Sequence, residues 1–131
     1  MKNLLCFCVL AFIFSGCSYT VYDMNKGELK IAKKASYLVK YTTDIPTGTT
    51  AEISYTDLNN TTQKVKDATG KWEKAIELPS GQDIKFRVDV KLPQTNPASK
   101  LITSETVDGV VVDEQVQTGK KVMYRFGFKL P

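Results

Sequence analysis

Residues 84–92 read IKFRVDVKL, and this stretch has the most regular pattern in the 131-residue chain. Apolar and charged side chains alternate along it without interruption. Alternation with a period of two residues is typical of a β-strand that packs one face on a core and exposes the other to water. Ser80 and Gly81 before the stretch and Pro93 after it favour turns and strand ends. We therefore expect a half-buried antiparallel strand here.

The same period continues through the chain from Ser36 onward, and no helical period follows the first 16 residues. Asp108-Gly109 predicts a two-residue hairpin turn, because both residues accept the positive φ angles of a type I′ turn. These patterns predict an all-β, immunoglobulin-like antiparallel β-sandwich of about seven to eight strands, with a small barrel as the main alternative. The predicted core comprises Tyr37, Val39, Tyr41, Ile53, Tyr55, Trp72, Ile76, Ile84, Phe86, Val88, Val90, Ile102, Val111, Val122, Tyr124, Phe126 and Phe128.

The N-terminus has the organisation of a secretory signal. Lys2 is followed by the apolar run Leu4–Phe14, which is shorter than the roughly 20 residues that a membrane-spanning helix needs. The next residues complete the string FSGC over Phe14–Cys17, which resembles the lipobox of bacterial lipoproteins. The resemblance implies that the signal is removed before Cys17 and that this cysteine is acylated. An ordinary signal peptide that contains a cysteine is the alternative.

These features divide the chain into three parts. Residues 1–16 are predicted to be a lipoprotein signal peptide, residues 17–35 the lipidated cysteine and a tether, and residues 36–131 the β-sandwich domain. The tether is predicted from weak alternation, with a possible short strand near Leu29–Ala32. Its lysines, at positions 26, 30, 33 and 34, are candidates for contact with anionic head groups near the anchor, and a solvated linker is the alternative.

The composition excludes several kinds of site. The chain has no histidine, and its three cysteines all lie in the first 17 residues. The folded part therefore lacks the side chains for a Cys/His zinc site, a thiol nucleophile or a Ser-His-Asp triad. A net charge of +4, evenly spread, is too small to indicate nucleic-acid binding. We expect no enzymatic activity, no cofactor, no metal and no nucleic-acid partner.

Carboxylates are the remaining candidates for chemistry. Glu105, Asp108, Asp113 and Glu114 gather around the predicted hairpin, which suggests a calcium or general-acid site. They lack the regular spacing of a calcium loop, and we expect them to form a solvated face. Acidic and basic residues share the outward face of residues 83–91 and are expected to pair across strands; they are Asp83, Lys85, Arg87, Asp89 and Lys91.

Aromatic side chains and a strand edge are the candidates for binding. Tyr37, Tyr41, Tyr55, Trp72 and Tyr124 include candidates for a platform that stacks a sugar, although their alternation with polar residues places most of them in the core. The strand predicted over residues 61–66 is weakly apolar and is expected at a sheet edge, where its two lysines oppose pairing with another chain.

Two strings carry a resemblance to a known family. Ile53–Asp57 reads ISYTD and Val107–Val111 reads VDGVV. They resemble the I-x-Y-x-D strand and the V-D-G-x-V hairpin of the MmpS (membrane protein small) transport-accessory domains, over roughly Tyr37–Phe128. The chain departs from the family in having Ser80 where tryptophan is common, and in lacking a cysteine pair in the folded part and the usual transmembrane helix. The resemblance implies a β-sandwich, a membrane-tethered extracytoplasmic setting and assistance to transport.

Together these features predict a lipid-anchored protein of the bacterial cell envelope, held by Cys17. We expect a non-catalytic binding or accessory module that assists a membrane transport system or binds an integral-membrane or envelope protein. A module that binds a carbohydrate or small ligand is the alternative. Ser18, in place of an aspartate after the cysteine, favours the outer membrane by the enterobacterial sorting rule.

Overall fold

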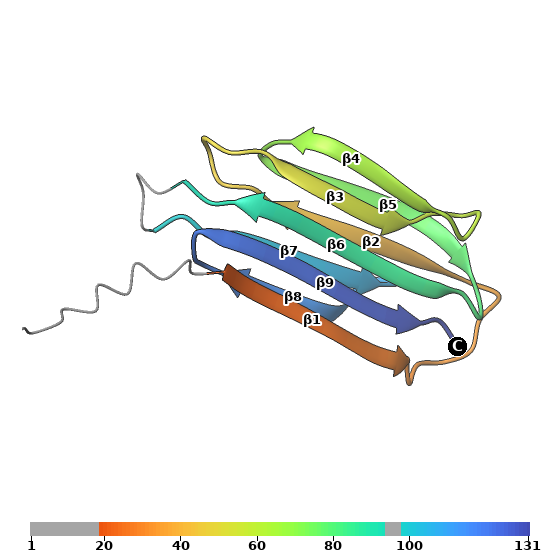
Figure 1. The fold of residues 1–131 in the computed structure, drawn as a ribbon. Helices are drawn as coiled ribbons and strands as arrows, with labels where there is room; N and C mark the ends of the chain where they lie inside the picture. The colour runs from red at the N-terminus through yellow and green to blue at the C-terminus, as the bar shows by residue number, and fades with distance from the viewer. Residues whose placement is uncertain (1–18, 94–97) are drawn as a thin grey trace, which may run out of the picture.

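The computed structural model describes residues 19–93 and 98–131. This part of the chain forms nine strands in two packed sheets and contains no helix (Figure 1). One sheet has the order β1-β9-β6-β3-β4, and the other has the order β5-β2-β7-β8. The predicted all-β sandwich is confirmed. The strands are β1 (Tyr19–Glu28), β2 (Ser36–Asp44), β3 (Ala51–Thr56), β4 (Thr62–Ala68), β5 (Lys71–Pro79), β6 (Asp83–Lys91), β7 (Leu101–Val107), β8 (Val110–Gln117) and β9 (Lys121–Lys129).

β6, the strand with the clearest sequence pattern, lies at the centre of the five-stranded sheet. It pairs antiparallel with β9 on one side and with β3 on the other. Its apolar residues, from Ile84 to Val90, are at most 4% exposed, and its charged residues point to the outer face. The alternation therefore identified both the strand and the face that it buries.

Aromatic rings fill the centre of the core. The ring centroid of Phe86 on β6 lies 5.0 Å from that of Tyr41 on β2, 6.1 Å from that of Trp72 on β5 and 5.8 Å from that of Tyr124 on β9. These separations are within the range of favourable aromatic contacts. Because Phe86 contacts both sheets and is fully buried, it is a central packing residue of the sandwich.

The core prediction is confirmed at most positions but is wrong for β7 and β8. Ile102 is only partly buried, and Val111 is 53% exposed. In β7 apolar and polar residues share both faces, so alternation alone does not fix which face is inward. In β8 a register shift between the Glu105–Asp113 and Thr106–Val111 pairs turns Val111 outward. Three further predicted core residues, Tyr55, Trp72 and Ile76, are partly buried against the core. The inward residues of β7 are Leu101, Thr103, Glu105 and Val107.

The tether prediction is wrong for most of its length. Tyr19–Glu28 forms β1, which pairs with β9 in the one parallel pair among the described strands. Residues 29–35 then cross to the other sheet, without the strand predicted near Leu29–Ala32. The alternation in β1 is weak because β1 is an edge strand whose side chains are mostly exposed and make little contact with the core. β1 therefore belongs to the sandwich, and the predicted signal peptide and Cys17 lie outside the described residues.

The predicted Asp108-Gly109 turn is confirmed. Asp108 has a φ of 50° and Gly109 a φ of 80°, as a type I′ turn requires. The Asp108 carboxylate accepts hydrogen bonds from the Leu38 amide at 2.9 Å and from Lys34 Nζ at 2.8 Å. These bonds attach the turn to the beginning of β2.

Candidate functional site

The four acidic residues around the β7–β8 turn do not converge on one site. Asp108 stabilises the turn, and Glu114 is exposed on the outer face. Glu105 and Asp113 point between the sheets. Within residues 19–93 and 98–131, no group of three or more His, Cys, Asp or Glu side chains is placed to hold a metal ion.

Glu105 differs most from its predicted environment. It was predicted to lie on a solvated face, but it is 0% exposed. Its Oε2 atom lies 3.1 Å from the Tyr124 hydroxyl, and its Oε1 atom has no hydrogen-bond partner among the described residues. Burial raises the pKa of Glu105 well above the ordinary value for a glutamate. The prediction failed because it assigned the wrong face of β7 to the core.

Tyr124 connects Glu105 to a second carboxylate. The Tyr124 hydroxyl donates to Asp113 Oδ2 at 2.8 Å, and the Tyr22 hydroxyl donates to Asp113 Oδ1 at 2.9 Å. The rings of Tyr22 and Tyr124 stack, with centroids 5.5 Å apart. One hydroxyl proton cannot serve two carboxylates, so both contacts are hydrogen bonds only when one carboxyl group is protonated and donates to the tyrosine oxygen. Burial favours the proton on Glu105. We call these four residues the inner carboxylate cluster, which joins β1 and β9 to β7 and β8.

The aromatic residues considered for a sugar platform pack inside the protein. Tyr37, Tyr41 and Tyr124 are at most 1% exposed. Tyr55 and Trp72 are partly buried, with ring centroids 5.6 Å apart. The expectation that most of these rings belong to the core is confirmed, and they do not form an exposed platform.

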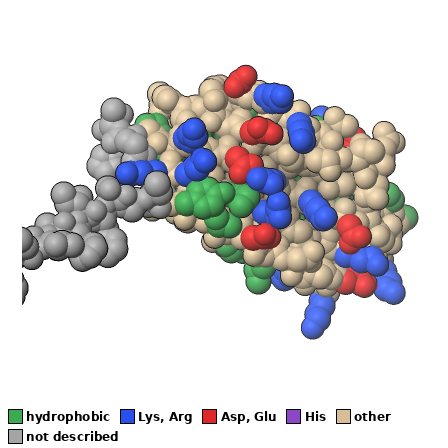
Figure 2. Space-filling view, viewed as in Figure 1, with side chains coloured by type: hydrophobic (Ala, Val, Ile, Leu, Met, Phe, Trp, Pro, Cys, Tyr) green, Lys and Arg blue, Asp and Glu red, His purple; other side chains and the backbone are tan. Residues whose placement is uncertain are grey.

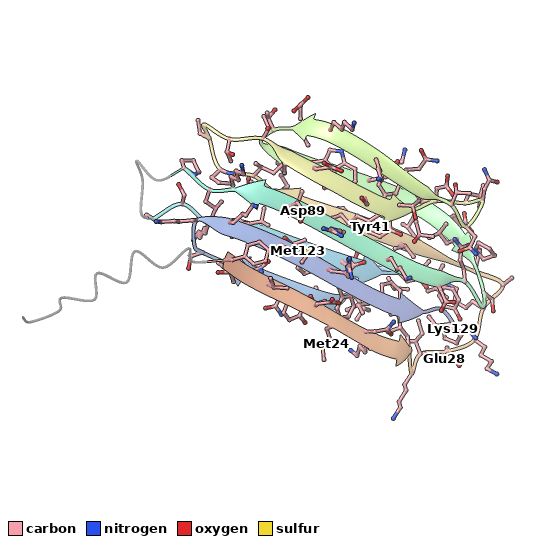
Figure 3. All side chains as sticks on the ribbon, viewed as in Figure 1. Met24, Glu28, Tyr41, Asp89, Met123 and Lys129 are labelled. Atoms are coloured by element: carbon pink, nitrogen blue, oxygen red, sulfur yellow. The ribbon has the colours of Figure 1, made fainter. Side chains whose placement is uncertain are left out.

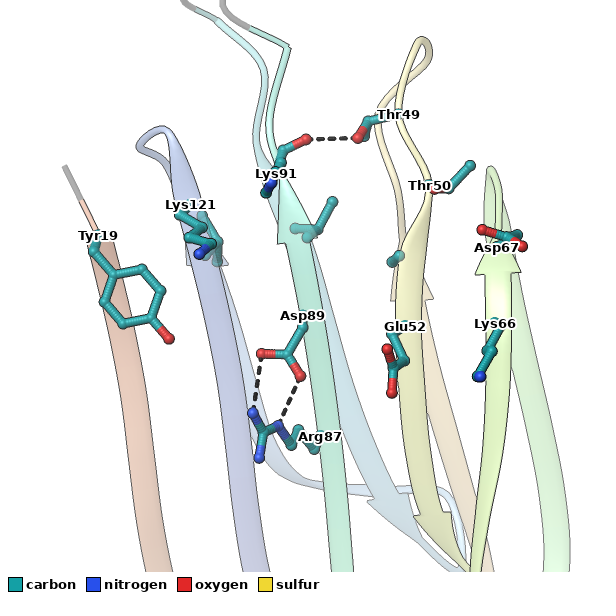
Figure 4. A pocket seen from close by; sticks show the side chains of 13 residues that line it. Tyr19, Thr49, Thr50, Glu52, Lys66, Asp67, Arg87, Asp89, Lys91 and Lys121 are labelled. Carbon is teal, nitrogen blue, oxygen red and sulfur yellow. Dashed lines mark hydrogen bonds and ion pairs between the residues drawn. The ribbon is translucent and has the colours of Figure 1, made fainter. Parts of the chain in front are cut away.

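The outer face of the five-stranded sheet carries two adjoining hollows. The first has a volume of about 650 Å³ and lies near the start of β1 (Figure 4). The second has a volume of about 770 Å³ and lies further along the same strands. Lysine, arginine and acidic side chains are interspersed over this face, around a small apolar patch (Figure 2). Residues that line both hollows are Glu52, Arg87 and Asp89.

Arg87 lies where the two hollows meet and is already paired. Its Nε donates to Asp89 Oδ2 at 2.7 Å, and this bond raises the pKa of the guanidinium. Both residues lie on β6, so the prediction that these charges pair across strands is wrong for Arg87 and Asp89. A cross-strand pair joins Arg125 to Asp23 at 3.5 Å. All four side chains are more than a third exposed, so these pairs contribute little to stability.

The edge strands of the two sheets lie in two pairs. β4 and β5 flank one side of the sandwich, and β1 and β8 flank the other (Figure 1). The predicted edge position of residues 61–66 is confirmed, since β4 is the last strand of its sheet. Lys64 and Lys66 on β4, and Lys71 and Lys74 on β5, are exposed. Charged side chains of this kind oppose the addition of a further strand.

The opposite side exposes several apolar side chains, together with Asp23 and Glu114. On β8, Val110, Val111 and Val116 are 66%, 53% and 57% exposed. On β1, Tyr19 and Val21 are 50% and 47% exposed. β8 has no lysine or arginine, and β1 has none before position 26. We call β8, together with residues 19–24 of β1, the open side, because its exposed edge lacks the lysines that guard β4 and β5.

None of the described residues forms a helix with the length and apolar character needed to span a bilayer. A protein-family model described as Mycobacterium membrane protein matches residues 12–126. The chain belongs to this family. The match covers β1 to β8 and most of β9, so it includes the segment that the sequence predicted to be a tether. No curated protein matches the chain.

Membership of the Mycobacterium membrane protein family confirms the resemblance to MmpS-type domains and supports a membrane-associated location in the cell envelope. Two features of this family member were missed from its sequence. The exposure of Val111 was missed because the register of β7 and β8 shifts between the Glu105–Asp113 and Thr106–Val111 pairs, and β1 was missed because its alternation is weak. The three consecutive valines at positions 110–112 were the signal that an apolar edge was present, because strict alternation cannot bury all three.

Proposed function

We propose that this chain is a membrane-anchored, non-catalytic accessory module that binds a protein partner through the open side and assists a membrane transport system. The contrast between the lysine-guarded β4–β5 side and the apolar β1–β8 side carries this proposal. Family membership supports the membrane setting. The lipobox-like string before Ser18 supports a lipid on Cys17 as the anchor, and Ser18 itself favours the outer membrane.

The partner would add an extended segment to the edge of β8. Backbone hydrogen bonds supply affinity in this mode of recognition, and alternate side chains supply specificity. Val111 and Val116, which are more than half exposed, offer apolar contacts beside the β8 backbone. An apolar transmembrane-proximal segment of an integral-membrane protein fits this edge better than a charged peptide does.

Photocrosslinking in intact cells tests the proposal. A photoreactive amino acid at Val116 is expected to capture an integral-membrane protein, and the same group at Gln63 of β4 is the matched control on the guarded side. For the next comparison the photoreactive group is placed at Val110, which leaves positions 111 and 116 free for substitution. A Val111→Lys/Val116→Lys variant should then lower the crosslinking yield at least tenfold, because lysine opposes strand addition. Equal capture from positions 116 and 63, or no capture from either, would contradict the proposal.

A binding module for a carbohydrate or small ligand is the second candidate. The two hollows on the outer face favour it, because each is lined by four cationic and three acidic side chains, and this small positive excess suits an acidic sugar. If this candidate is correct, an acidic envelope glycan at 100 times its Kd should stabilise the chain by about 2.7 kcal/mol. An Arg125→Gln variant should lose most of this thermal shift, whereas Lys40→Gln on the other sheet should keep it. Absence of saturable binding would remove the candidate.

A further inference from the structure

β1 begins at one end of the sandwich, two residues after Cys17 in the sequence. Tyr19 is the first residue of β1, so only Ser18 separates it from Cys17. Two residue steps span about 7 Å at most. The ten residues of β1 then run to the opposite end, a length of about 30 Å at roughly 3.3 Å per residue. The end of the sandwich at which β1 begins, which we call the base, is therefore the end that an anchor before Tyr19 holds at the membrane.

The base is rich in lysine. Among the described residues, the strand termini and turns at this end contain five lysines and one acidic residue. The corresponding positions at the opposite end, which Glu28 and Lys129 mark in Figure 3, contain four lysines and four acidic residues. The charged residues at these strand termini and turns are Lys71, Lys91, Lys100, Lys120, Lys121 and Asp44, and Asp67, one residue before the end of β4, also lies at this end (Figure 4).

The side chains of the base are available to a surface. All five lysines are exposed, and none of Lys71, Lys91 and Lys121 forms a salt bridge with a described carboxylate. Tyr19 is 50% exposed, and Lys121 Nζ lies 5.8 Å from the centroid of its ring (Figure 4). An aromatic ring with a polar tip beside lysines is the composition that favours a membrane interface.

We propose that the base is a docking surface for the anionic head groups of the membrane in which the chain is anchored, so that the sandwich stands upright on the bilayer. The inference rests on the anchoring part of the proposed function but not on its protein partner. A lysine near an anionic surface strengthens binding about fivefold, and the effect is lost beyond a Debye length of about 10 Å. Lys26, Lys30, Lys33 and Lys34, which the sequence placed near the anchor, lie toward the opposite end and are too distant to contribute. In this orientation the open side faces sideways, toward proteins in the same membrane.

Hydrogen exchange on the full chain in nanodiscs tests the orientation. In discs with one-third phosphatidylglycerol, we expect amide exchange in the turns at residues 45–50, 69–70 and 118–120 to be at least fivefold slower than in phosphatidylcholine discs. The turns at residues 57–61, 80–82 and 108–109 should exchange equally in both. The protection should disappear in 0.5 M NaCl, because salt screens exposed charges.

Two matched variants separate specific contacts from net charge. Lys71→Gln/Lys91→Gln/Lys121→Gln should abolish the protection, and Lys30→Gln/Lys33→Gln/Lys129→Gln, which removes the same charge from the opposite end, should retain it. Equal loss in both variants, or protection along β8 in place of the base, would overturn the inference. A chain that stays on both kinds of disc without protection contradicts the orientation alone, whereas a chain that leaves both contradicts the anchor as well. Failure of the crosslinking experiment would affect neither outcome, since the discs contain no other protein.

Discussion

Replacing Phe86 by alanine is expected to lower the free energy of unfolding by about 3–5 kcal/mol. Phe86 is fully buried and its ring contacts aromatic residues from both sheets, so the substitution removes apolar contacts and leaves a cavity at their junction. The loss corresponds to a fall in Tm of more than about 10 °C for a domain of this size. Urea and thermal denaturation of the two proteins measure it.

The control for this substitution is Leu38→Ala on the outer face of β2. Leu38 is 49% exposed, so its truncation should change the free energy of unfolding by less than about 1 kcal/mol. If the two variants lose similar stability, the core does not centre on Phe86 and the packing of the two sheets described above is wrong.

Replacing Glu105 by glutamine is expected to raise the free energy of unfolding at pH 7.5 by about 1–3 kcal/mol. The carboxyl group is buried, with one oxygen unpartnered, and it faces the Asp113 carboxylate across the Tyr124 hydroxyl. Desolvation and the negative neighbour both favour the neutral acid, so the pKa of Glu105 is raised in the folded protein. Glutamine keeps the shape, has no charge, and retains a donor for the tyrosine oxygen.

The same shift gives the stability of the wild-type protein a defined pH dependence. Below the pKa of the unfolded state, about 4.3, Glu105 is protonated in both the folded and the unfolded state, so its titration does not make stability depend on pH. As the pH rises above this value, the unfolded chain releases a proton that the folded protein retains, and stability falls until the pKa of the folded state is passed. Between pH 5 and pH 7.5, the free energy of unfolding of the wild-type protein should therefore fall more than that of Glu105→Gln.

Denaturation of both proteins at the two pH values isolates the contribution of Glu105, because the other titrating groups are common to them. Glu114→Gln removes the same charge from an exposed position of the adjacent strand and should leave the pH dependence unchanged. Equal destabilisation of Glu105→Gln at both pH values would show that the ionised carboxylate is required, and would contradict the protonated cluster.

Local patterns predicted the parts of the fold in which one face is uniformly apolar. β6 and β9 were identified with their inward residues, and the Asp108-Gly109 turn was identified from the conformational preferences of two residues. β7 was located correctly but given the wrong phase, because threonine and glutamate share its inward face with leucine and valine. Among the candidate site residues, too, some positions were predicted correctly and others were missed. The aromatic residues were placed correctly in the core, whereas the burial of Glu105 and the exposure of Val111 were missed.

The sequence by itself determined that the described residues form strands and no helix, where most of these strands and turns fall, and that histidine is absent and cysteine ends at position 17. These properties depend on side-chain period and residue type, which are local. Tertiary structure alone decided that Tyr19–Glu28 is an edge strand and that Glu105 and Asp113 share one tyrosine. It also decided which lysines lie at the base and which at the opposite end. The physical reason is that the pairing of β1 with β9 and the facing of β7 and β8 toward β9 and β1 join residues far apart in sequence, and the period within one segment does not identify the segment that it pairs with.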